Sequence, residues 1–426
     1  MHAVLLGNGV TGFTAALRLR ELRPDWRITM LSGESTHPWS RPALMYVFMG
    51  HLRYQDTKPF EDSMWPKKRI ELVRAWATRL DTANKRLELH GREPLAYDRL
   101  LLATGSKPNR FGWPGQDLAG VQGLYGLMDL KRLHENVARA RRAVIVGGGL
   151  IGIELAEMLH SRGVPVTLLV REASYWDNAL PAEESAMVNR VIRAAGMDLR
   201  LSTELERIED DGHGRVGAVR TKAGERIECQ LVGLTAGVSP NLDLVEGSGI
   251  ATGRGVRVDR ALRTSAPDVW AAGDCAELVD GDAERGLVQQ VWYTGRAQGR
   301  AAAESMAGLD VRYEPAPWFN SAKFLHLEYQ VYGDGPRGVD GAQSVHWEHA
   351  SGLRSARVVH LPREGGRVIG FHFMGLRARQ AVCERWIAER ATLGRVLETF
   401  GDVGFDPEFT PDFARQAAAS LRSAAR

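Results

Sequence analysis

The chain has 426 residues, of which 44% are hydrophobic and 25% are charged. This composition is typical of a globular protein with more than one buried core, and it excludes a disordered, collagen-like or disulfide-stapled chain. The 55 basic and 52 acidic residues nearly cancel to a net charge of +3, so charge does not indicate a nucleic-acid-binding protein.

The first predicted element is a short apolar strand followed by a glycine-rich turn. Gly7, Gly9 and Gly12 fit the spacing GxGxxG, apolar residues at helical spacing continue to Glu21, and a second strand follows over 27–31. The first glycine permits a tight turn, the second lets the backbone approach a pyrophosphate, and the third allows close packing of helix and strand. The free N–H groups of the helix then face the phosphates, so we predict a dinucleotide site here.

The same arrangement occurs again from Ala143 to Gly163, with a following strand over 164–169. One GxGxxG match is a weak signal, but two matches, each between a strand and a helix, indicate two dinucleotide-binding domains. Two dinucleotides in one chain suggest electron transfer between a flavin and a nicotinamide. The residues that we place at the second cofactor are Gly147, Gly149, Ile151 and Gly152.

The C-terminal third has a different character. After the linker-like Pro315-Ala316-Pro317, β-like runs occur over 328–332, 357–361 and 367–373. A long helical pattern then extends over 378–397, and the tail over 413–426 is a further helical candidate. We therefore expect a mixed α+β domain at this end.

The cysteines and the start of the chain indicate a cellular compartment. Cys229, Cys275 and Cys383 are far apart, so the sequence has no CxxC or CxxxxC redox pair and no zinc-type spacing, and we predict no metal site. Such cysteine usage fits a reducing compartment. We find no signal-peptide pattern and no apolar run of about 18 residues, so the sequence predicts a cytoplasmic protein without a membrane span.

Three further segments resemble motifs of the FAD-dependent pyridine nucleotide-disulfide oxidoreductase superfamily. They are YDRLLLATGSKP over 97–108, GVSPN over 237–241 and TSAPDVWAAGDC over 264–275. Together with the two glycine-rich turns they follow the family's order over about residues 1 to 310. The resemblance implies an α/β, glutathione-reductase-like fold with an FAD-binding domain over 1–112 and 240–314, an NAD(P)-binding domain over 113–239 and an α+β interface domain over 315–426.

The resemblance also implies roles for residues at the FAD site. Arg41 matches an arginine that contacts FAD phosphate, which suits a bidentate donor. Glu34, just beyond the second strand, is the candidate for binding the adenosine ribose. Trp292 is either close to the flavin or a core tryptophan. The other FAD-contacting residues that the motifs imply are Ala103, Thr104, Gly105, Gly237, Gly273 and Asp274.

The second cofactor is NAD(P)H, and its exact form stays open. Val170 occupies the position where an acidic residue would bind the ribose of NAD, and Arg171 follows, as in NADPH-using members. The second arginine of those members is absent and Glu172 adds negative charge, so the preference for NADPH is slight. Glu154 matches a family glutamate near the nicotinamide–flavin contact, and we assign it a catalytic role.

The segment over 41–46 bears on the electron acceptor. It resembles the RPxLSK loop of ferredoxin and rubredoxin reductases and of the amino-terminal half of nitrite reductases, but Met45 and Tyr46 replace the Ser-Lys pair. The lysine that pairs with the glutamate matching Glu154 is therefore missing. Tyr46 is a candidate catalytic residue beside the flavin, with a core tyrosine as the alternative, and Asn320 stands where ferredoxin reductases carry an aromatic residue.

The implied function is transfer of electrons from NAD(P)H through FAD to an external acceptor. Residues 31–49 contain no cysteine, which disfavours disulfide and cysteine-dependent peroxide chemistry. The leading acceptor is a small acidic redox protein such as a ferredoxin or rubredoxin. The alternatives are an oxidase that uses O₂, a reductase component of a larger complex, and an NAD(P)H-sensing flavoprotein that binds a partner. We expect a monomer or homodimer and no nucleic-acid partner.

Overall fold

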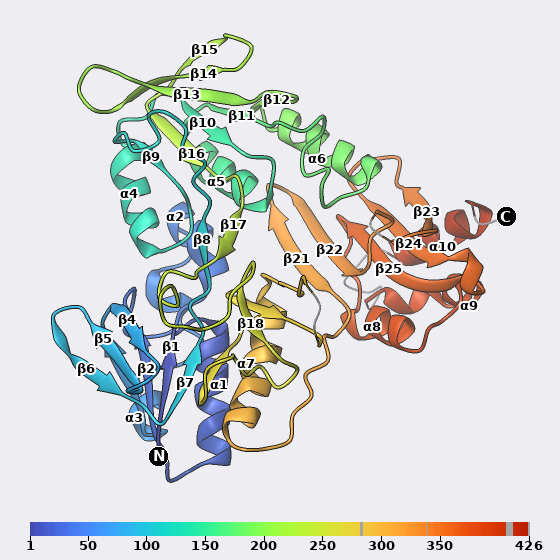
Figure 1. Ribbon diagram of the computed structural model, residues 1–426. Coiled ribbons are helices and arrows are strands. Elements are labelled where there is room, and N and C mark those ends of the chain that lie inside the picture. The colour runs from blue at the N-terminus through green and yellow to red at the C-terminus, as the bar shows by residue number, and fades with distance from the viewer. Residues whose placement is uncertain (282–283, 338, 406–411, 425–426) are drawn as a thin grey trace. The chain divides into compact units, whose positions relative to one another are not determined.

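The computed structural model describes residues 1–281, 284–337, 339–405 and 412–424 (Figure 1). The chain forms two compact units. The first comprises Met1–Phe111, Gly123–Ala138 and Gly237–Pro315, and the second comprises Gly112–Gln122, Arg139–Ala236 and Ala316–Arg426. Each unit therefore contains one glycine-rich turn, and the second also contains the C-terminal third. The predicted three-domain boundaries stay a prediction.

The first unit is built on a five-stranded parallel sheet in the order β19-β7-β1-β2-β3. Its central strands are short runs of buried aliphatic side chains, as expected for a parallel sheet covered on both faces. The strands are β1 (His2–Leu6), β2 (Arg27–Ser32), β3 (Ile70–Arg74), β7 (Arg99–Leu102) and β19 (Val269–Ala271).

Two helices of this unit, α1 (Val10–Leu22) and α7 (Trp292–Met306), pack closely against each other. A Cβ atom on Gly299 of α7 would lie 2.4 Å from the backbone oxygen of Thr11 in α1. A Cβ atom on Gly295 would lie 2.8 Å from the Oγ1 atom of Thr11. Glycine at these two positions therefore lets the backbone of α7 reach the first turn of α1.

The remaining elements of the first unit surround this sheet. An antiparallel three-stranded sheet is formed by β4 (Ala77–Asp81), β5 (Arg86–Leu89) and β6 (Arg92–Ala96). Two small pairs are β8 (Ser106–Pro108) with β17 (Val238–Pro240), and β18 (Val256–Val258) with β20 (Ala276–Leu278). The short helices are α2 (Leu44–Met49), α3 (Met64–Lys67) and α4 (Leu127–Val137).

The second unit contains another five-stranded parallel sheet, in the order β12-β11-β10-β16-β9. Its strands are β9 (Val121–Gln122), β10 (Ala143–Val146), β11 (Val166–Leu169), β12 (Asp198–Arg200) and β16 (Leu231–Leu234). Helix α5 (Leu150–His160) follows the glycine-rich turn, and α6 (Ala182–Ala194) precedes β12. A small antiparallel sheet consists of β13 (Leu205–Asp210), β14 (Val216–Thr221) and β15 (Arg226–Glu228).

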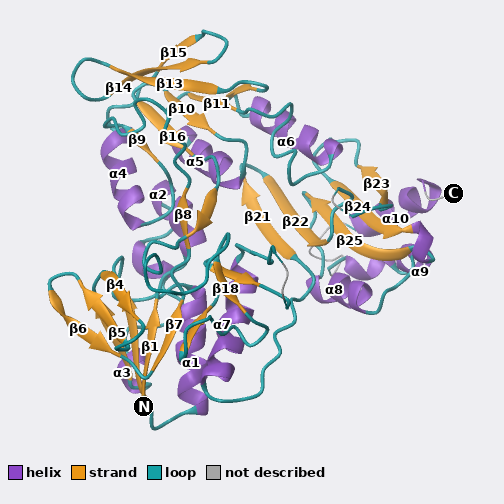
Figure 2. Ribbon diagram, in the orientation of Figure 1, coloured by secondary structure: helices purple, strands orange, loops and turns teal. Residues whose placement is uncertain are grey.

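The C-terminal third of the second unit is an antiparallel sheet in the order β21-β22-β25-β24-β23 (Figure 2). One face packs on helices α8 (Gln380–Ala388), α9 (Leu393–Glu398) and α10 (Phe413–Ala424) through a cluster of buried aromatic and aliphatic side chains. The strands are β21 (Phe319–Phe324), β22 (Leu327–Gly333), β23 (Gln343–Glu348), β24 (Ser355–Leu361) and β25 (Arg367–Met374).

The fold class and most predicted elements are confirmed, but the single long helix predicted over 378–397 is wrong. The segment forms two helices, α8 and α9, separated at Arg390, whose φ is 55°. A left-handed residue ends an α-helix, and Thr392 then caps the next one by accepting a hydrogen bond from the Arg395 N–H at 3.4 Å. Within the described ranges, no helix combines the length and apolar character that a membrane crossing requires.

Candidate functional site

The first glycine-rich turn joins β1 to α1 and approaches β7. Gly7 has a φ of 113°, and a Cβ atom there would lie 2.1 Å from the backbone oxygen of Ala103. A Cβ atom on Gly12 would lie 1.9 Å from the backbone oxygen of Gly7. Gly9 has open space in front of it and begins α1 without a side-chain cap. The backbone of the turn is thus closely packed at Gly7 and Gly12, and the first N–H groups of α1 have no side-chain cap. These free N–H groups fit a bound pyrophosphate.

The two other FAD motifs converge on this turn. Ala103 follows β7 and donates its N–H to the Leu6 oxygen at 2.8 Å. Gly273 follows β19 with a φ of 80°, and a Cβ atom there would lie 2.4 Å from Thr11 Oγ1. The ends of β1, β7 and β19 therefore meet at the N-terminus of α1. This is the edge of a parallel sheet where ligands bind in open α/β folds.

Asp274 belongs to a polar network at this edge. Its Oδ2 accepts a hydrogen bond from the Ser106 hydroxyl at 3.1 Å, and Gln290 Nε2 lies 2.6 Å from the same Ser106 oxygen. Burial raises the pKa of the Asp274 carboxyl, against the opposing effects of Ser106 and Arg41. A largely desolvated carboxylate with a spare acceptor oxygen is suited to receive a hydroxyl group of a ligand.

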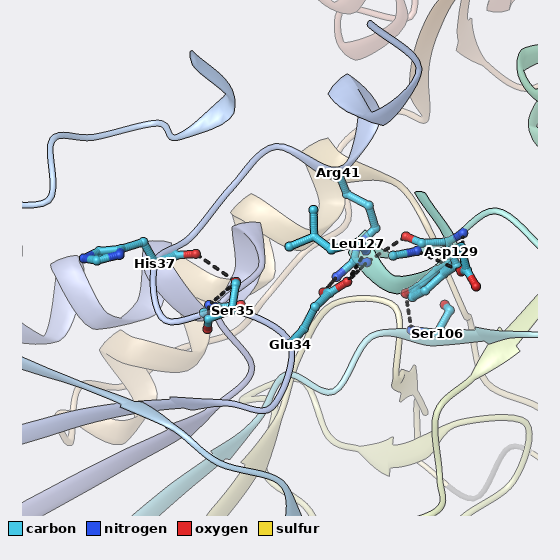
Figure 3. Close-up of polar contacts among 10 residues, drawn as sticks. Glu34, Ser35, His37, Arg41, Ser106, Leu127 and Asp129 are labelled. Carbon is cyan, nitrogen blue, oxygen red and sulfur yellow. Dashed lines mark hydrogen bonds and ion pairs between the residues drawn. The ribbon is translucent and has the colours of Figure 1, made fainter. Parts of the chain in front are cut away.

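Glu34 and Arg41, which the sequence assigned to ribose and phosphate, form an ion pair with each other (Figure 3). Arg41 Nη2 lies 2.8 Å from Glu34 Oε2, and the Leu127 N–H donates to Glu34 Oε1 at 2.8 Å. Arg41 Nη1 also donates to the Tyr125 oxygen at 2.7 Å, and its guanidinium lies 4.6 Å from the Tyr125 ring centroid. Asp129 accepts the N–H groups of Tyr125 and Gly126, at 2.9 and 3.1 Å. The start of α4 is thereby attached to the loop after β2.

A cleft of about 410 Å³ opens beside Glu34 within the first unit. It offers one carboxylate, several cations and hydroxyl groups next to the carboxyl end of β2. This combination fits the ribose and adenine end of a dinucleotide. Its lining residues include Glu34, Ser35, Tyr54, Lys58, Arg74 and Lys131.

The second turn, between β10 and α5, repeats the geometry of the first. Gly147 has a φ of 126°, and a Cβ atom there would lie 2.5 Å from the Thr235 backbone oxygen. A Cβ atom on Gly152 would lie 2.8 Å from the Gly147 oxygen and 2.9 Å from Tyr175 Oη. Gly149 again has open space in front of it, and Ile151 is half-buried in the first turn of α5. The turn therefore also fits a pyrophosphate.

The residues after β11 bring one apolar side chain and two opposite charges to the second site. Val170 is fully buried, and its side chain is the nearest neighbour that a Cβ atom on Gly148 would meet, at 2.7 Å. The Arg171 side chain is 72% exposed and pairs with Glu172, with 2.8 Å between Arg171 Nη2 and Glu172 Oε1. A phosphate approaching Arg171 would therefore compete with the Glu172 carboxylate.

Glu154 lies on α5, two residues after the last glycine of the turn, and is half-buried. Burial, helped by the nearby Glu157 carboxylate, raises its pKa from 4.5 to about 8. Among the described residues, no cation acts on the pKa of the Glu154 carboxyl. The Glu154 side chain is therefore mainly protonated at neutral pH and can donate a hydrogen bond.

The other predicted residues lie in the first unit, apart from Asn320. Tyr46 lies in α2 and is half-buried, with its ring centroid 6.2 Å from that of His51. Trp292 begins α7, is 39% exposed and contacts Tyr293 edge to face.

Gly237 has a φ of 90° and accepts the Asn109 N–H at 3.1 Å. Gly105 has a φ of 70° and its oxygen accepts the Asn241 N–H at 2.9 Å, while Thr104 Oγ1 donates to the Asn241 oxygen at 3.0 Å.

Three residues at the first site were missed by sequence reasoning: Ser106, Tyr125 and Gln290. The Ser106 N–H donates to Tyr125 Oη at 2.8 Å, and Gln290 bonds to the Ser106 hydroxyl. Ser106 directly follows the Ala103-Thr104-Gly105 motif, so its position was available as a signal. Gln290 lies two positions before the predicted Trp292 but was given no role, and Tyr125 lies in a segment without a recognisable motif. Only the fold brings these two residues to Ser106.

All three cysteines are free and buried. Burial raises the pKa of the Cys229 thiol to about 12 and also raises the pKa of the Cys275 and Cys383 thiols. Buried thiols with raised pKa values are poor nucleophiles. In the part of the chain that the structure describes, no three His, Cys, Asp or Glu side chains are placed to hold a metal ion.

Comparison with known families and proteins agrees with this geometry. The family model described as pyridine nucleotide-disulphide oxidoreductase matches residues 1–299. The ferredoxin–NAD(+) reductase component of the biphenyl dioxygenase system from Paraburkholderia xenovorans is 33% identical over 273 residues, covering 64% of this chain and 66% of that protein, just under two thirds of its length. Rubredoxin-NAD(+) reductase from Acinetobacter baylyi is 28% identical over 317 residues, covering 72% of this chain and 79% of that protein.

Solved structures show the same fold. The crystal structure of the covalent putidaredoxin reductase–putidaredoxin complex matches with a TM-score of 0.81 at 22% identity, covering 91% of this chain and 93% of that one. This likeness supports the architecture of two dinucleotide-binding folds derived above.

Proposed function

Because the chain belongs to the pyridine nucleotide-disulphide oxidoreductase family and is an FAD-dependent NAD(P)H oxidoreductase, we propose that it passes electrons to a small iron–sulfur protein of the ferredoxin or rubredoxin type. The observation that carries this proposal is the combination of two dinucleotide turns with three buried, unpaired thiols. The chain lacks an accessible dithiol that could take the electrons, so the acceptor must come from outside.

The names of the relatives support the class of acceptor. The two relatives are named as reductases of a ferredoxin and of a rubredoxin. Met45, Tyr46 and Asn320 depart from the residues that the ferredoxin-reductase resemblance implies. The three free thiols support a location in a reducing compartment such as the cytoplasm.

The residues of the first unit would hold FAD. We assign the pyrophosphate to the turn of Gly7, Gly9 and Gly12, and the adenosine ribose to Glu34 in the cleft beside it. Arg41 neutralises phosphate charge, and Asp274 accepts a hydroxyl of the ribityl chain. Bound FAD supplies hydride acceptance from NAD(P)H and release of electrons one at a time. Gly105, Gly237 and Trp292 are the remaining residues that we assign to the FAD site.

The residues of the second unit would hold NAD(P)H. The turn of Gly147, Gly149 and Gly152 receives its pyrophosphate, and Arg171 and Glu172 meet its adenosine ribose. Glu154, protonated at neutral pH, donates a hydrogen bond to the carboxamide of the nicotinamide. Tyr46 takes the place of the family lysine on the FAD side. The donor is NADH or NADPH, and the Arg171–Glu172 pair decides between them.

The test is anaerobic mixing of the FAD-loaded protein with NADH and with NADPH in separate stopped-flow experiments. Flavin bleaching faster than turnover, followed by reduction of an added ferredoxin or rubredoxin, is the expected result. Rapid bleaching followed by reaction with O₂ alone would instead assign an oxidase.

A second candidate function is NAD(P)H sensing by a flavoprotein that binds a partner. It is favoured by the sequence, in which Met45 and Tyr46 replace the Ser-Lys pair, because loss of the lysine that pairs with the glutamate matching Glu154 is consistent with slow reduction of the flavin. Bleaching too slow for turnover with both donors would contradict the reductase and support this candidate.

A further inference from the structure

The loop that follows β11, over 170–181, is held from two sides inside the second unit. It begins with Arg171 and Glu172, the residues proposed above to meet the adenosine ribose of NAD(P)H. One side of the loop contacts the glycine-rich turn and α6, and the other contacts the C-terminal sheet. These contacts suggest that the C-terminal sheet has a role in nucleotide binding.

Tyr175 attaches the loop to the glycine-rich turn. Its ring is fully buried, and its hydroxyl donates to the Gly149 oxygen at 2.9 Å. Its N–H donates to Asn189 Oδ1 at 3.0 Å, and its oxygen accepts the Ser185 hydroxyl at 2.7 Å. A shift of Tyr175 would therefore displace both the cap of α5 and the ribose-end residues.

Trp176 attaches the same loop to the C-terminal sheet. Its ring centroid lies 5.0 Å from that of Tyr329 in β22 and 6.2 Å from that of Phe324 in β21. Arg337 donates to the backbone oxygen of Asp177, the next residue. Phe324 and Tyr329 are 0% and 4% exposed, so both rings are fixed by their own packing.

The backbone at Trp176 is strained. Its φ is 60°, a left-handed conformation that is a genuine outlier for a bulky side chain. Such a conformation persists only where the surroundings determine it, and it is concentrated at functional positions. Here the surroundings are the two aromatic rings of the C-terminal sheet on one side and buried Tyr175 on the other.

A buried ionic group fixes the base of the loop to the same sheet. Glu184 in α6 is 0% exposed and lies 2.8 Å from Arg357 Nε in β24, and Glu183 lies 2.7 Å from Arg357 Nη2. A buried ion pair adds little net stability, but breaking it is costly. Its main effect here is therefore to fix the position of α6 relative to β24. Arg190, six residues after Glu184 in the same helix, pairs with Glu348 of β23.

We infer that Trp176 is a positioning residue, through which Phe324 and Tyr329 of the C-terminal sheet hold the ribose-binding loop in its binding-competent form. The C-terminal sheet thereby sets the affinity for NAD(P)H. An ordered loop has less conformational entropy to lose on binding, which is the physical origin of the gain. The inference rests on the proposed assignment of the second glycine-rich turn to NAD(P)H.

The experiment compares Trp176→Gly with wild type in the FAD-loaded protein. Glycine adopts a positive φ freely, so the backbone path remains possible while the aromatic contact is lost. The probes are 5′-AMP and 2′,5′-ADP, whose Kd values are measured by calorimetry, together with KM and kcat for NADH and NADPH. We expect Kd and KM to rise about five- to tenfold, the equivalent of roughly one immobilised side chain, with kcat and FAD content unchanged.

Two further variants separate the possible failures. Trp347→Phe is the matched control, because Trp347 lies on the opposite face of the C-terminal sheet, in the cluster packed on α8–α10, and it should leave both Kd values unchanged. Gly152→Val should abolish nucleotide binding, because its side chain would meet the Gly147 oxygen. Normal binding by Gly152→Val would overturn the site assignment.

Normal binding by Trp176→Gly, while Gly152→Val binds nothing, would overturn the inference itself. Phe324→Leu is the second test, should Trp176→Gly fail to fold. It removes the Phe324 ring that Trp176 contacts, and it should raise the Kd of both probes, as Trp176→Gly does. Unchanged Kd values in this variant would also contradict the inference.

Discussion

Glu172 is a carboxylate that pairs with Arg171, the arginine proposed above to meet the adenosine ribose of NAD(P)H. The Arg171 side chain of this pair is 72% exposed, so solvent screens the attraction between the two charges strongly. Replacing Glu172 with Ala frees Arg171 and removes a negative charge. We expect the ratio of kcat/KM for NADPH to that for NADH to rise about three- to fivefold, which steady-state assays with both donors measure.

The control for this substitution is Glu206→Ala, which removes an exposed carboxylate that pairs with its neighbour Arg207 on β13. The donor ratio should not change there. An unchanged ratio in Glu172→Ala would mean that the ribose end of NAD(P)H does not reach Arg171.

Glu154 gives the protein a specific dependence of stability on pH. Its pKa is raised from 4.5 to about 8, so between these values the unfolded chain has lost a proton that the folded chain keeps. The unfolding free energy therefore falls as pH rises through this window. Glu154→Gln lacks the titration, so its stability relative to wild type should increase from pH 5 to pH 8.5, as measured by urea unfolding at several pH values.

The matched control is Glu246→Gln, an exposed carboxylate of the first unit. Its stability relative to wild type should stay level over the same pH range. If the Glu154→Gln difference also stayed level, the carboxyl would be ionised in the folded protein and could not donate the proposed hydrogen bond.

At the scale of residues, the glycines were predictable and their partners were not. Gly7 and Gly12 follow from the GxGxxG spacing set between a strand and a helix, which occurs twice in the chain. By contrast, Glu34 binds the N–H of Leu127, which lies 93 positions away. No local pattern encodes such a contact, because it depends on where α4 begins relative to β2.

At the scale of elements, the packing of α1 on α7 depends on two small residues. Gly299→Ala would place a methyl group 2.4 Å from the Thr11 oxygen, a backbone atom that cannot move aside. We expect a loss of about 1–3 kcal/mol in stability and a lower FAD content, because the same turn of α1 faces the proposed pyrophosphate. Thermal unfolding and the ratio of flavin to protein absorbance measure these two effects.

Gly394→Ala is the comparison for this variant, because a Cβ atom on Gly394 has nothing within 4 Å. In α9 the alanine should be neutral or stabilising by up to about 1 kcal/mol. Equal behaviour of the two variants would show that the α1–α7 contact is more relaxed than the structure indicates.

The division between α8 and α9 shows why helix lengths are hard to predict. The apolar spacing continues through the break, so periodicity alone gives one helix over 378–397. The left-handed backbone at Arg390 and the cap at Thr392 end one helix and begin the next. Arginine carries no preference for that conformation, so the tertiary packing of Trp386 and Leu397 decides it.

At the scale of the whole molecule, the proposed electron path uses no thiol. We expect N-ethylmaleimide to leave acceptor reduction unchanged and to add no mass to the native protein, because Cys229, Cys275 and Cys383 are all 0% exposed. The same reagent should label all three cysteines after denaturation, which mass spectrometry detects. Loss of activity together with a single adduct on the native protein would contradict an external acceptor reached without cysteine.

The order of segments within the first unit determines how late during synthesis this unit can complete its fold. Helix α1 ends at Leu22, whereas its partner α7 begins only at Trp292, about 270 residues later. At ~5–20 residues per second, synthesis leaves the glycine-packed face of α1 uncovered for roughly 14–54 s. Gly273 and Asp274 emerge almost as late. The nascent chain therefore carries an unfinished nucleotide fold through most of translation, and FAD can be loaded only near its end.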